Sequence, residues 1–197
     1  MKTILKVAVL SISIFCAFAF YPNHKTKTVV IDVGHGGKDH GAQVGDINEK
    51  DITLAVAKQL QLLITSENIN LIIESTADDY TSLKDRVTKI NSYQPDLLIS
   101  LHVGDYYDNS KRGIEAFYFK NEKFETSSIK AAQQLLKNAP KQLEDSGLNE
   151  ANFYLLKNSK TPAVLLNLGY LSNPEDVDFI TSEYGQKKIA KAILKSL

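Results

Sequence analysis

The chain has 197 residues, 43% of them apolar, and its 23 lysine and arginine residues balance 23 aspartate and glutamate residues. This length and composition fit one globular domain with a full hydrophobic core. Because no lysine- and arginine-rich run occurs, the sequence excludes a protein that binds nucleic acid through a basic patch, and no nucleic-acid partner is expected.

Residues 1–19 have the features of a secretory signal peptide. Lys2 and Lys6 precede an apolar run over residues 7–20, and Ala17-Phe18-Ala19 matches a cleavage pattern. The run has about 14 residues, whereas a helix that spans a bilayer needs about 20. We therefore expect an exported protein, periplasmic or extracellular, with no stable membrane insertion after cleavage.

Two alternatives concern the same segment. It could be kept as a membrane anchor, or Cys16 could carry a lipid, although Phe15 is bulky where a lipoprotein signal has a small side chain. Cleavage after Ala19 removes Cys16, the only cysteine, and this excludes cysteine nucleophiles, thiolate metal sites and disulfides. It also leaves 23 − 2 = 21 basic residues against 23 acidic ones, so strong electrostatic capture by an anionic wall polymer is not expected.

After a short polar tether at residues 20–27, strands and helices are expected to alternate. Apolar runs predict strands at residues 28–33, 71–74, 97–101, 114–119 and 163–166. Helical spacing and capping residues predict helices at residues 51–66, 82–93, 126–139 and 183–197, with one more opened by Asn173 and Pro174. This order predicts an α/β fold, a single domain over residues 28–197 whose mostly parallel twisted sheet carries helices on both faces.

Polar residues follow the predicted strands where ligand sites of α/β sheets lie. His35 comes just after the first strand, His102 after the strand at 97–101, and Asn167 after the strand at 163–166. Together with Glu49, the two imidazoles make a three-ligand zinc site with a free position. The residues alone do not decide whether this zinc site exists, because either histidine could be structural and Glu49 could be a solvated carboxylate at a helix start.

Two further histidines are not expected to be ligands. His24 lies in the tether, and nothing pairs with His40 in the glycine-rich loop. That loop superficially suggests phosphate binding, but it lacks both the G-x-x-x-x-G-K-[ST] and the G-x-G-x-x-G spacing.

Six sequence blocks, in this order, resemble the bacterial zinc-dependent N-acetylmuramoyl-L-alanine amidases: residues 31–42, 49–54, 83–86, 99–102, 112–118 and 169–174. The resemblance implies a single-domain α/β fold, peptidoglycan as substrate and a place at the cell wall. It implies hydrolysis of the amide between the lactyl group of N-acetylmuramic acid and L-alanine. By motif position, His35, Glu49 and His102 correspond to the family's Zn²⁺ ligands. We expect a monomer, and the resemblance does not identify an activator protein.

The chain departs from this family at Asn167. The family has a glutamate there, which takes a proton from the attacking water and passes it to the leaving nitrogen. An amide cannot do this near neutral pH, and loss of a general base costs about 10²–10⁴ in rate. Three hypotheses stay open: a weak hydrolase, a hydrolase in which Glu115 or Asp105 supplies the carboxylate, and a non-catalytic zinc-dependent module that binds the wall or a partner enzyme. A zinc peptidase of similar architecture is a further class, but its motifs do not match.

Two further expectations concern the residues around the predicted ligands. Asp32 and Asp39 are near enough in sequence to orient a histidine ring, although Asp39 could equally be a turn residue. Arg86, on a predicted helix, is expected to be a structural ion-pair partner.

Overall fold

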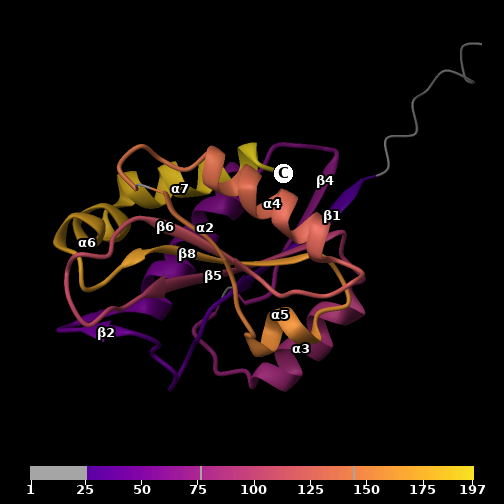
Figure 1. Cartoon of the computed structure of the whole chain (residues 1–197), viewed down its shortest axis with the longest axis horizontal. Coiled ribbons are helices and arrows are strands. Elements are labelled where there is room, and N and C mark those ends of the chain that lie inside the picture. Colours follow the sequence, from indigo (N-terminus) through magenta and orange to yellow (C-terminus); the bar gives the residue numbers. More distant parts are fainter. Residues whose placement is uncertain (1–25, 76, 144) are drawn as a thin grey trace, which may run out of the picture.

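The computed structural model describes residues 26–75, 77–143 and 145–197 (Figure 1). The predicted signal peptide and most of the predicted tether lie outside the described residues, so both stay predictions. The last tether residue, Lys27, begins the first strand, β1 (Lys27–Val33), and pairs with Ile69. Among the described residues, no helix has the length and apolar character needed to cross a membrane.

The fold is α/β, and a mostly parallel sheet forms its centre. In the part of the chain that the structure describes, six strands follow the order β4-β1-β5-β8-β6-β7. Neighbouring strands are parallel except β6 and β8, which pair antiparallel. The bounds are β4 (Ile69–Ile73), β5 (Leu97–Gly104), β6 (Ile114–Tyr118), β7 (Asp145–Glu150) and β8 (Ala163–Tyr170). All residues of β8 are buried, as expected of a strand covered on both faces.

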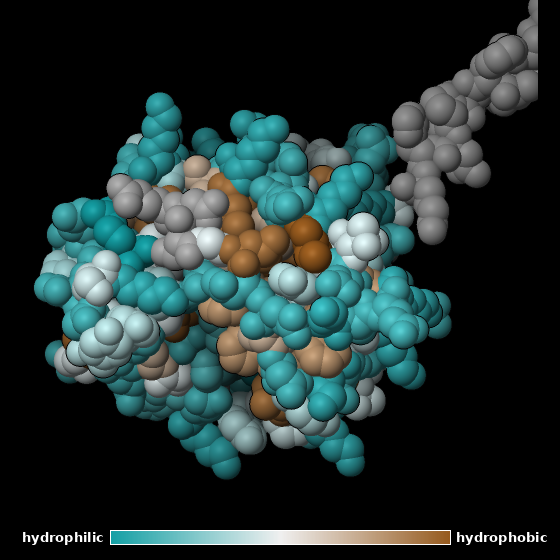
Figure 2. Space-filling model, viewed as in Figure 1, coloured by the Kyte–Doolittle hydropathy of each residue, from teal (hydrophilic) through white to brown (hydrophobic). Residues whose placement is uncertain are grey.

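Helices cover both faces of the sheet, as the sequence predicts (Figure 1). On one face lie α2 (Glu49–Leu63), α4 (Glu125–Lys137), α6 (Pro174–Thr181) and α7 (Glu183–Lys195), and their apolar residues join the larger core cluster. On the other face, α3 (Leu83–Ser92) and α5 (Tyr154–Asn158) enclose a smaller cluster. Most of the surface seen in Figure 2 is hydrophilic, with apolar side chains showing near its centre.

Capping side chains fix where several helices begin. Asn173 accepts hydrogen bonds from the backbone N–H groups of Glu175 and Asp176, and Pro174 occupies the first turn, as the sequence predicts. Ser82 and Ser182 cap α3 and α7 in the same way. The first turn of α3 lies at the cavity described below, which Leu83 and Arg86 help to line.

The central strands are longer than their apolar runs, and this changes the placement of two site residues. β5 continues to Gly104 and β8 to Tyr170, so His102 and Asn167 lie within strands and not after them. Since side chains alternate along a strand, both point to the same face as Leu98 and Leu165, which pack against α3 and α5.

Four short elements were not predicted. The hairpin of β2 (Gln43–Val44) and β3 (Ile47–Asn48) is too short for a hydrophobic period. The edge strand β7 has the polar sequence Asp-Ser-Gly-Leu-Asn-Glu, and α5 spans little more than one helical turn. Polar edge strands are common because they discourage pairing with other chains.

Candidate metal centre

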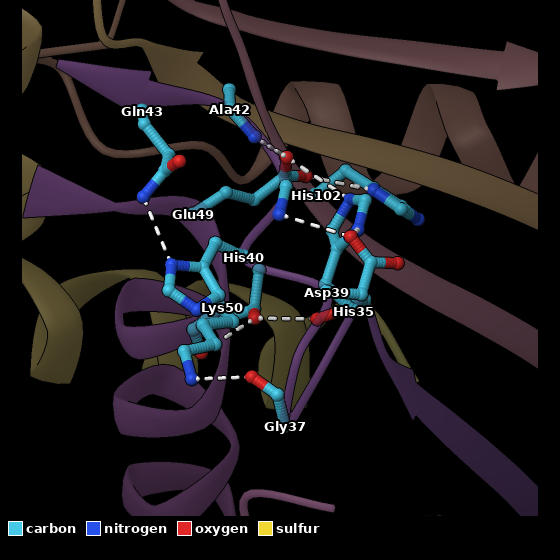
Figure 3. A network of polar contacts seen from close by, with 12 residues as sticks. His35, Gly37, Asp39, His40, Ala42, Gln43, Glu49, Lys50 and His102 are labelled. Carbon is cyan, nitrogen blue, oxygen red and sulfur yellow. Dashed lines mark hydrogen bonds and ion pairs between the residues drawn. The ribbon is translucent and has the colours of Figure 1, made fainter. Parts of the chain in front are cut away.

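Three side chains from separate elements meet at one end of the sheet. His35 lies in the loop after β1, Glu49 is the first residue of α2, and His102 lies on β5. One ligand atom from each residue lies within 4.8 Å of the other two. Glu49 stands between the rings, with Oε2 3.0 Å from His35 Nε2 and Oε1 2.8 Å from His102 Nδ1 (Figure 3). The structure thus brings together the three residues that the sequence predicts as ligands.

Glu49 is held as an ionised carboxylate. It is 4% exposed, and its oxygens accept hydrogen bonds from the backbone N–H groups of Ala42 at 2.8 Å and Val103 at 2.9 Å. Burial alone would raise the pKa of Glu49, but hydrogen bonds from His102 and His35 outweigh it and hold the pKa well below its usual range. The site therefore carries a fixed negative charge between two imidazoles, which suits a cation.

Asp39 orients the first histidine. Its Oδ1 atom lies 2.9 Å from His35 Nδ1, which leaves Nε2 facing Glu49 (Figure 3). Burial lowers the pKa of His35, but the carboxylates of Glu49 and Asp39 outweigh it and raise the pKa above its ordinary value of 6.5. A carboxylate on the second ring nitrogen is the usual support of a metal-bound histidine. Asp32 has a different role, because it binds the buried Arg86 at 2.9 Å.

Glycines around the three side chains make room for them. A Cβ atom at Gly41, where φ is +68°, would lie 2.4 Å from Glu49 Oε2 and 2.7 Å from His35 Cδ2. A Cβ atom at Gly34 would lie 2.8 Å from His102 Cε1. The glycines therefore allow the loop to pass close to the three side chains. This packing explains why the loop is rich in glycine without a bound phosphate.

The donor set fits zinc. Two imidazole nitrogens and one carboxylate, with a second carboxylate behind one ring, are typical of a catalytic zinc site that keeps an open position. His40 does not join this group, because its Nδ1 atom contacts Gln43 Nε2 at 2.9 Å. His24 lies outside the described residues.

A cavity of about 550 Å³ lies beside the three side chains, and Asn167 also lines it. Asn167 pairs in register with His102 on one side and with Glu115 on the other, so these side chains form a row across β5, β8 and β6. Asn167 is 4% exposed, and within the described residues its Oδ1 atom has no hydrogen-bond partner. A buried oxygen without a hydrogen-bond partner costs about 1–3 kcal/mol, so a donor that reached Oδ1 would stabilise the site.

The two carboxylates considered as substitutes for the missing glutamate both line this cavity. Antiparallel pairing of β6 places Glu115 opposite Asn167, which its sequence position did not reveal. Its oxygens already accept from Asn149 Nδ2 at 2.7 Å, from Lys111 Nζ at 2.9 Å and from the Tyr170 hydroxyl. Burial and this last bond raise the pKa of Tyr170 to about 12. The carboxylate oxygens of Glu115 are thus already occupied by three donors. Glu115 is therefore poorly placed to take a proton from a water molecule that attacks the substrate.

The sheet and the three converging side chains define an α/β domain in which His35, Glu49 and His102 could hold a metal ion beside a cavity. A family model described as N-acetylmuramoyl-L-alanine amidase matches residues 29–197, and the chain belongs to this family.

Individual relatives agree with the family. The chain is 35% identical over 185 residues to the uncharacterized protein YqiI of Bacillus subtilis (strain 168), covering 92% of this chain and 88% of YqiI. It is 36% identical over 177 residues to LytH of Staphylococcus saprophyticus, named a probable cell wall amidase, covering 88% of this chain but 58% of LytH. The crystal structure of an N-acetylmuramoyl-L-alanine amidase from Clostridium difficile 630 aligns with a TM-score of 0.81 at 33% identity, covering 87% of this chain and 95% of that chain.

Proposed function

We propose that this chain is a zinc-dependent peptidoglycan hydrolase that acts slowly on the amide between N-acetylmuramic acid and L-alanine. The observation that carries the proposal is the group of His35, Glu49 and His102, whose ligand atoms lie within 4.8 Å of one another beside a cavity. The family and the cell-wall amidase name of LytH support the substrate class. Because peptidoglycan lies outside the cytoplasm, we also propose that the chain works there, as a monomer.

Each site residue has a separate task in this proposal. Zinc, when bound by the three ligands, lowers the pKa of a coordinated water to about 7 and polarises the substrate carbonyl. Glu49 supplies the negative charge that the cation needs, and Asp39 fixes the ring of His35. Asn167 can accept a hydrogen bond at Oδ1 and donate from Nδ2, so it can align an amide or a water molecule. It cannot take up a proton and release it again, and turnover is slow for that reason.

The same residue supports a second candidate function, a zinc-dependent module that binds the wall or a partner enzyme without cleaving. A carboxamide has one acceptor and two donors, and it is therefore complementary to a peptide amide, whereas a carboxylate only accepts. With its side chain turned toward the cavity, the unpartnered Oδ1 atom of Asn167 would accept an N–H group of a bound peptide.

Purified protein without residues 1–19 would be incubated with zinc and muropeptides beside the Asn167→Glu and Asn167→Gln variants. Restoring the carboxylate should accelerate release of the peptide about 10²–10⁴-fold. The glutamine variant is the matched control, because it has the length of glutamate but cannot accept a proton, and it should stay at the parent rate.

The outcomes separate the hypotheses. Equal rates for the parent and Asn167→Glu would show that Asn167 does not limit turnover. Cleavage by the glutamate variant alone, with muropeptide binding retained by the parent, would favour the binding module. In Asn167→Glu, two buried carboxylates would face each other across β6 and β8, which raises the pKa of at least one of them and lowers stability. Thermal unfolding of the variant must therefore be compared with that of the parent.

A further inference from the structure

The loop that carries the first ligand has a strained backbone. His35 has φ +66°, and Gly36 and Gly37 follow with φ +131° and +57°. The left-handed conformation is unfavourable for a residue with a side chain, so surrounding contacts must hold His35 in it. The backbone at His35 decides where its ring meets Glu49, and these contacts therefore decide whether the ligands are preformed.

The guanidinium group of Arg86, on α3, supplies such contacts. Its Nη2 atom donates to the carbonyl oxygen of His35 at 2.8 Å, and Nη1 donates to the carbonyl oxygen of Val33 and to Asp32 Oδ1 at 2.9 Å. Asp32 also accepts from Ser100 Oγ on β5 at 2.5 Å. Because Arg86 is 5% exposed, these bonds are shielded from water. One planar group thus ties α3 to the end of β1 and to the ligand loop, and Asp32 links this network to β5.

Other contacts hold the residues beside His35. The carbonyl oxygen of Gly34 accepts from Thr53 Oγ1 at 3.2 Å, and the N–H group of Gly37 donates to Asp78 Oδ1 at 2.6 Å. These bonds anchor the two ends of the turn. The bond from Arg86 engages the carbonyl of the strained residue itself.

We propose that Arg86 is a positioning residue, which holds the His35 backbone in its left-handed conformation and thereby presets the ring for the metal. The inference rests on the proposed zinc site and adds a residue that acts through a ligand. It depends on the fork of the guanidinium group, which reaches two carbonyl oxygens and a carboxylate together. Lysine keeps the charge opposite Asp32 but is a point charge that cannot reproduce the fork.

Two measurements on Arg86→Lys test the proposal. Competition with a chelator should show that zinc affinity falls about 10–100-fold, the usual cost of losing a group that supports a ligand. In metal-free protein, hydrogen exchange at the Gly36 amide, which donates to the Asp39 carbonyl at 2.9 Å, should be roughly tenfold faster, because a charge-assisted bond that holds the loop is lost. Exchange at the Val103 amide, which binds Glu49 from β5, should not change.

Arg112→Lys is the matched control, since it makes the same chemical change at an arginine that bonds Glu175 and the Gln142 carbonyl, away from this loop. It should leave both readouts at parent values. Unchanged zinc affinity and unchanged Gly36 exchange in Arg86→Lys would overturn the proposal, as would equally faster exchange at Gly36 and Val103, which indicates general loosening. If the parent binds no zinc, the proposed function fails, and the exchange measurement still decides whether Arg86 holds the loop.

Discussion

Replacing Glu49 by glutamine tests the hydrogen-bond arrangement at the centre of the site. The two carboxylate oxygens accept from the N–H groups of Ala42 and Val103, one oxygen each, as well as from the two histidine rings. A glutamine side chain has only one oxygen, so in either orientation its NH₂ group faces a backbone N–H. One charge-assisted bond is lost and one buried donor is left unpaired, which together should lower the free energy of unfolding by about 2–4 kcal/mol.

The assay is urea unfolding of metal-free protein in the presence of a chelator. The control is Glu74→Gln, another buried carboxylate, which pairs with Lys89 at 2.9 Å through one oxygen while the other has no partner among the described residues. Its NH₂ group can take the free position, and the loss of stability should be smaller. A Glu49→Gln protein as stable as the parent would refute the hydrogen-bond arrangement on which the site depends.

The pH dependence of this difference follows from the two pKa shifts. The pKa of Glu49 is lowered, so its contribution to stability is complete above its ordinary value of 4.5 and is lost as the pH falls toward the folded-state pKa. The pKa of His35 is raised, so its contribution is complete below 6.5 and is lost as the pH rises through the folded-state pKa. The stability gap between the parent and Glu49→Gln should therefore be largest between about pH 4.5 and 6.5. A gap that grows steadily into alkaline pH would contradict this assignment.

Three further substitutions probe the surroundings of the ligands. Gly41→Ala should weaken zinc binding, measured by competition with a chelator, because the new Cβ would lie 2.4 Å from Oε2 of Glu49. Gly45→Ala is the control, since Gly45 also has a positive φ but a Cβ there would meet nothing within 4 Å, and its zinc affinity should equal that of the parent. Asp39→Asn should reduce zinc affinity by about 10-fold or more in the same assay, and full affinity would mean that the carboxylate does not support the ligand ring. Glu115→Gln should leave muropeptide turnover at the parent rate, whereas a drop of about 10²–10⁴-fold would identify Glu115 as the proton acceptor.

Much of the site could be predicted because its residues lie near the carboxyl ends of strands, either just after the strand, as His35 does, or in its last residues, as His102 and Asn167 do. The apolar runs located β1, β5 and β8, and the carboxyl ends of parallel strands converge at one edge of a sheet. The sequence alone therefore places His35 and His102 near each other. The resemblance of the surrounding blocks to a known family then distinguished ligands from ordinary polar residues.

Other parts of the site depend on strand pairing and on long-range hydrogen bonds, which cannot be predicted from the sequence. Glu115 lies opposite Asn167 only because β6 runs antiparallel to β8. The role of Arg86 as more than an ion-pair partner of Asp32 depends on the path of the backbone at His35. Such contacts join residues more than 50 positions apart, and no local period or spacing encodes them.

Zinc content is the most direct test of the central claim, that His35, Glu49 and His102 bind one metal ion. Protein purified without chelator and without residues 1–19 would be analysed by elemental mass spectrometry, beside the His102→Ala and Glu49→Ala variants and the Asn167→Glu variant. We expect one zinc per chain in the parent and in Asn167→Glu, and little or none in the two ligand variants. A folded parent without zinc, or ligand variants that retain it fully, would show that these three residues do not form a zinc site.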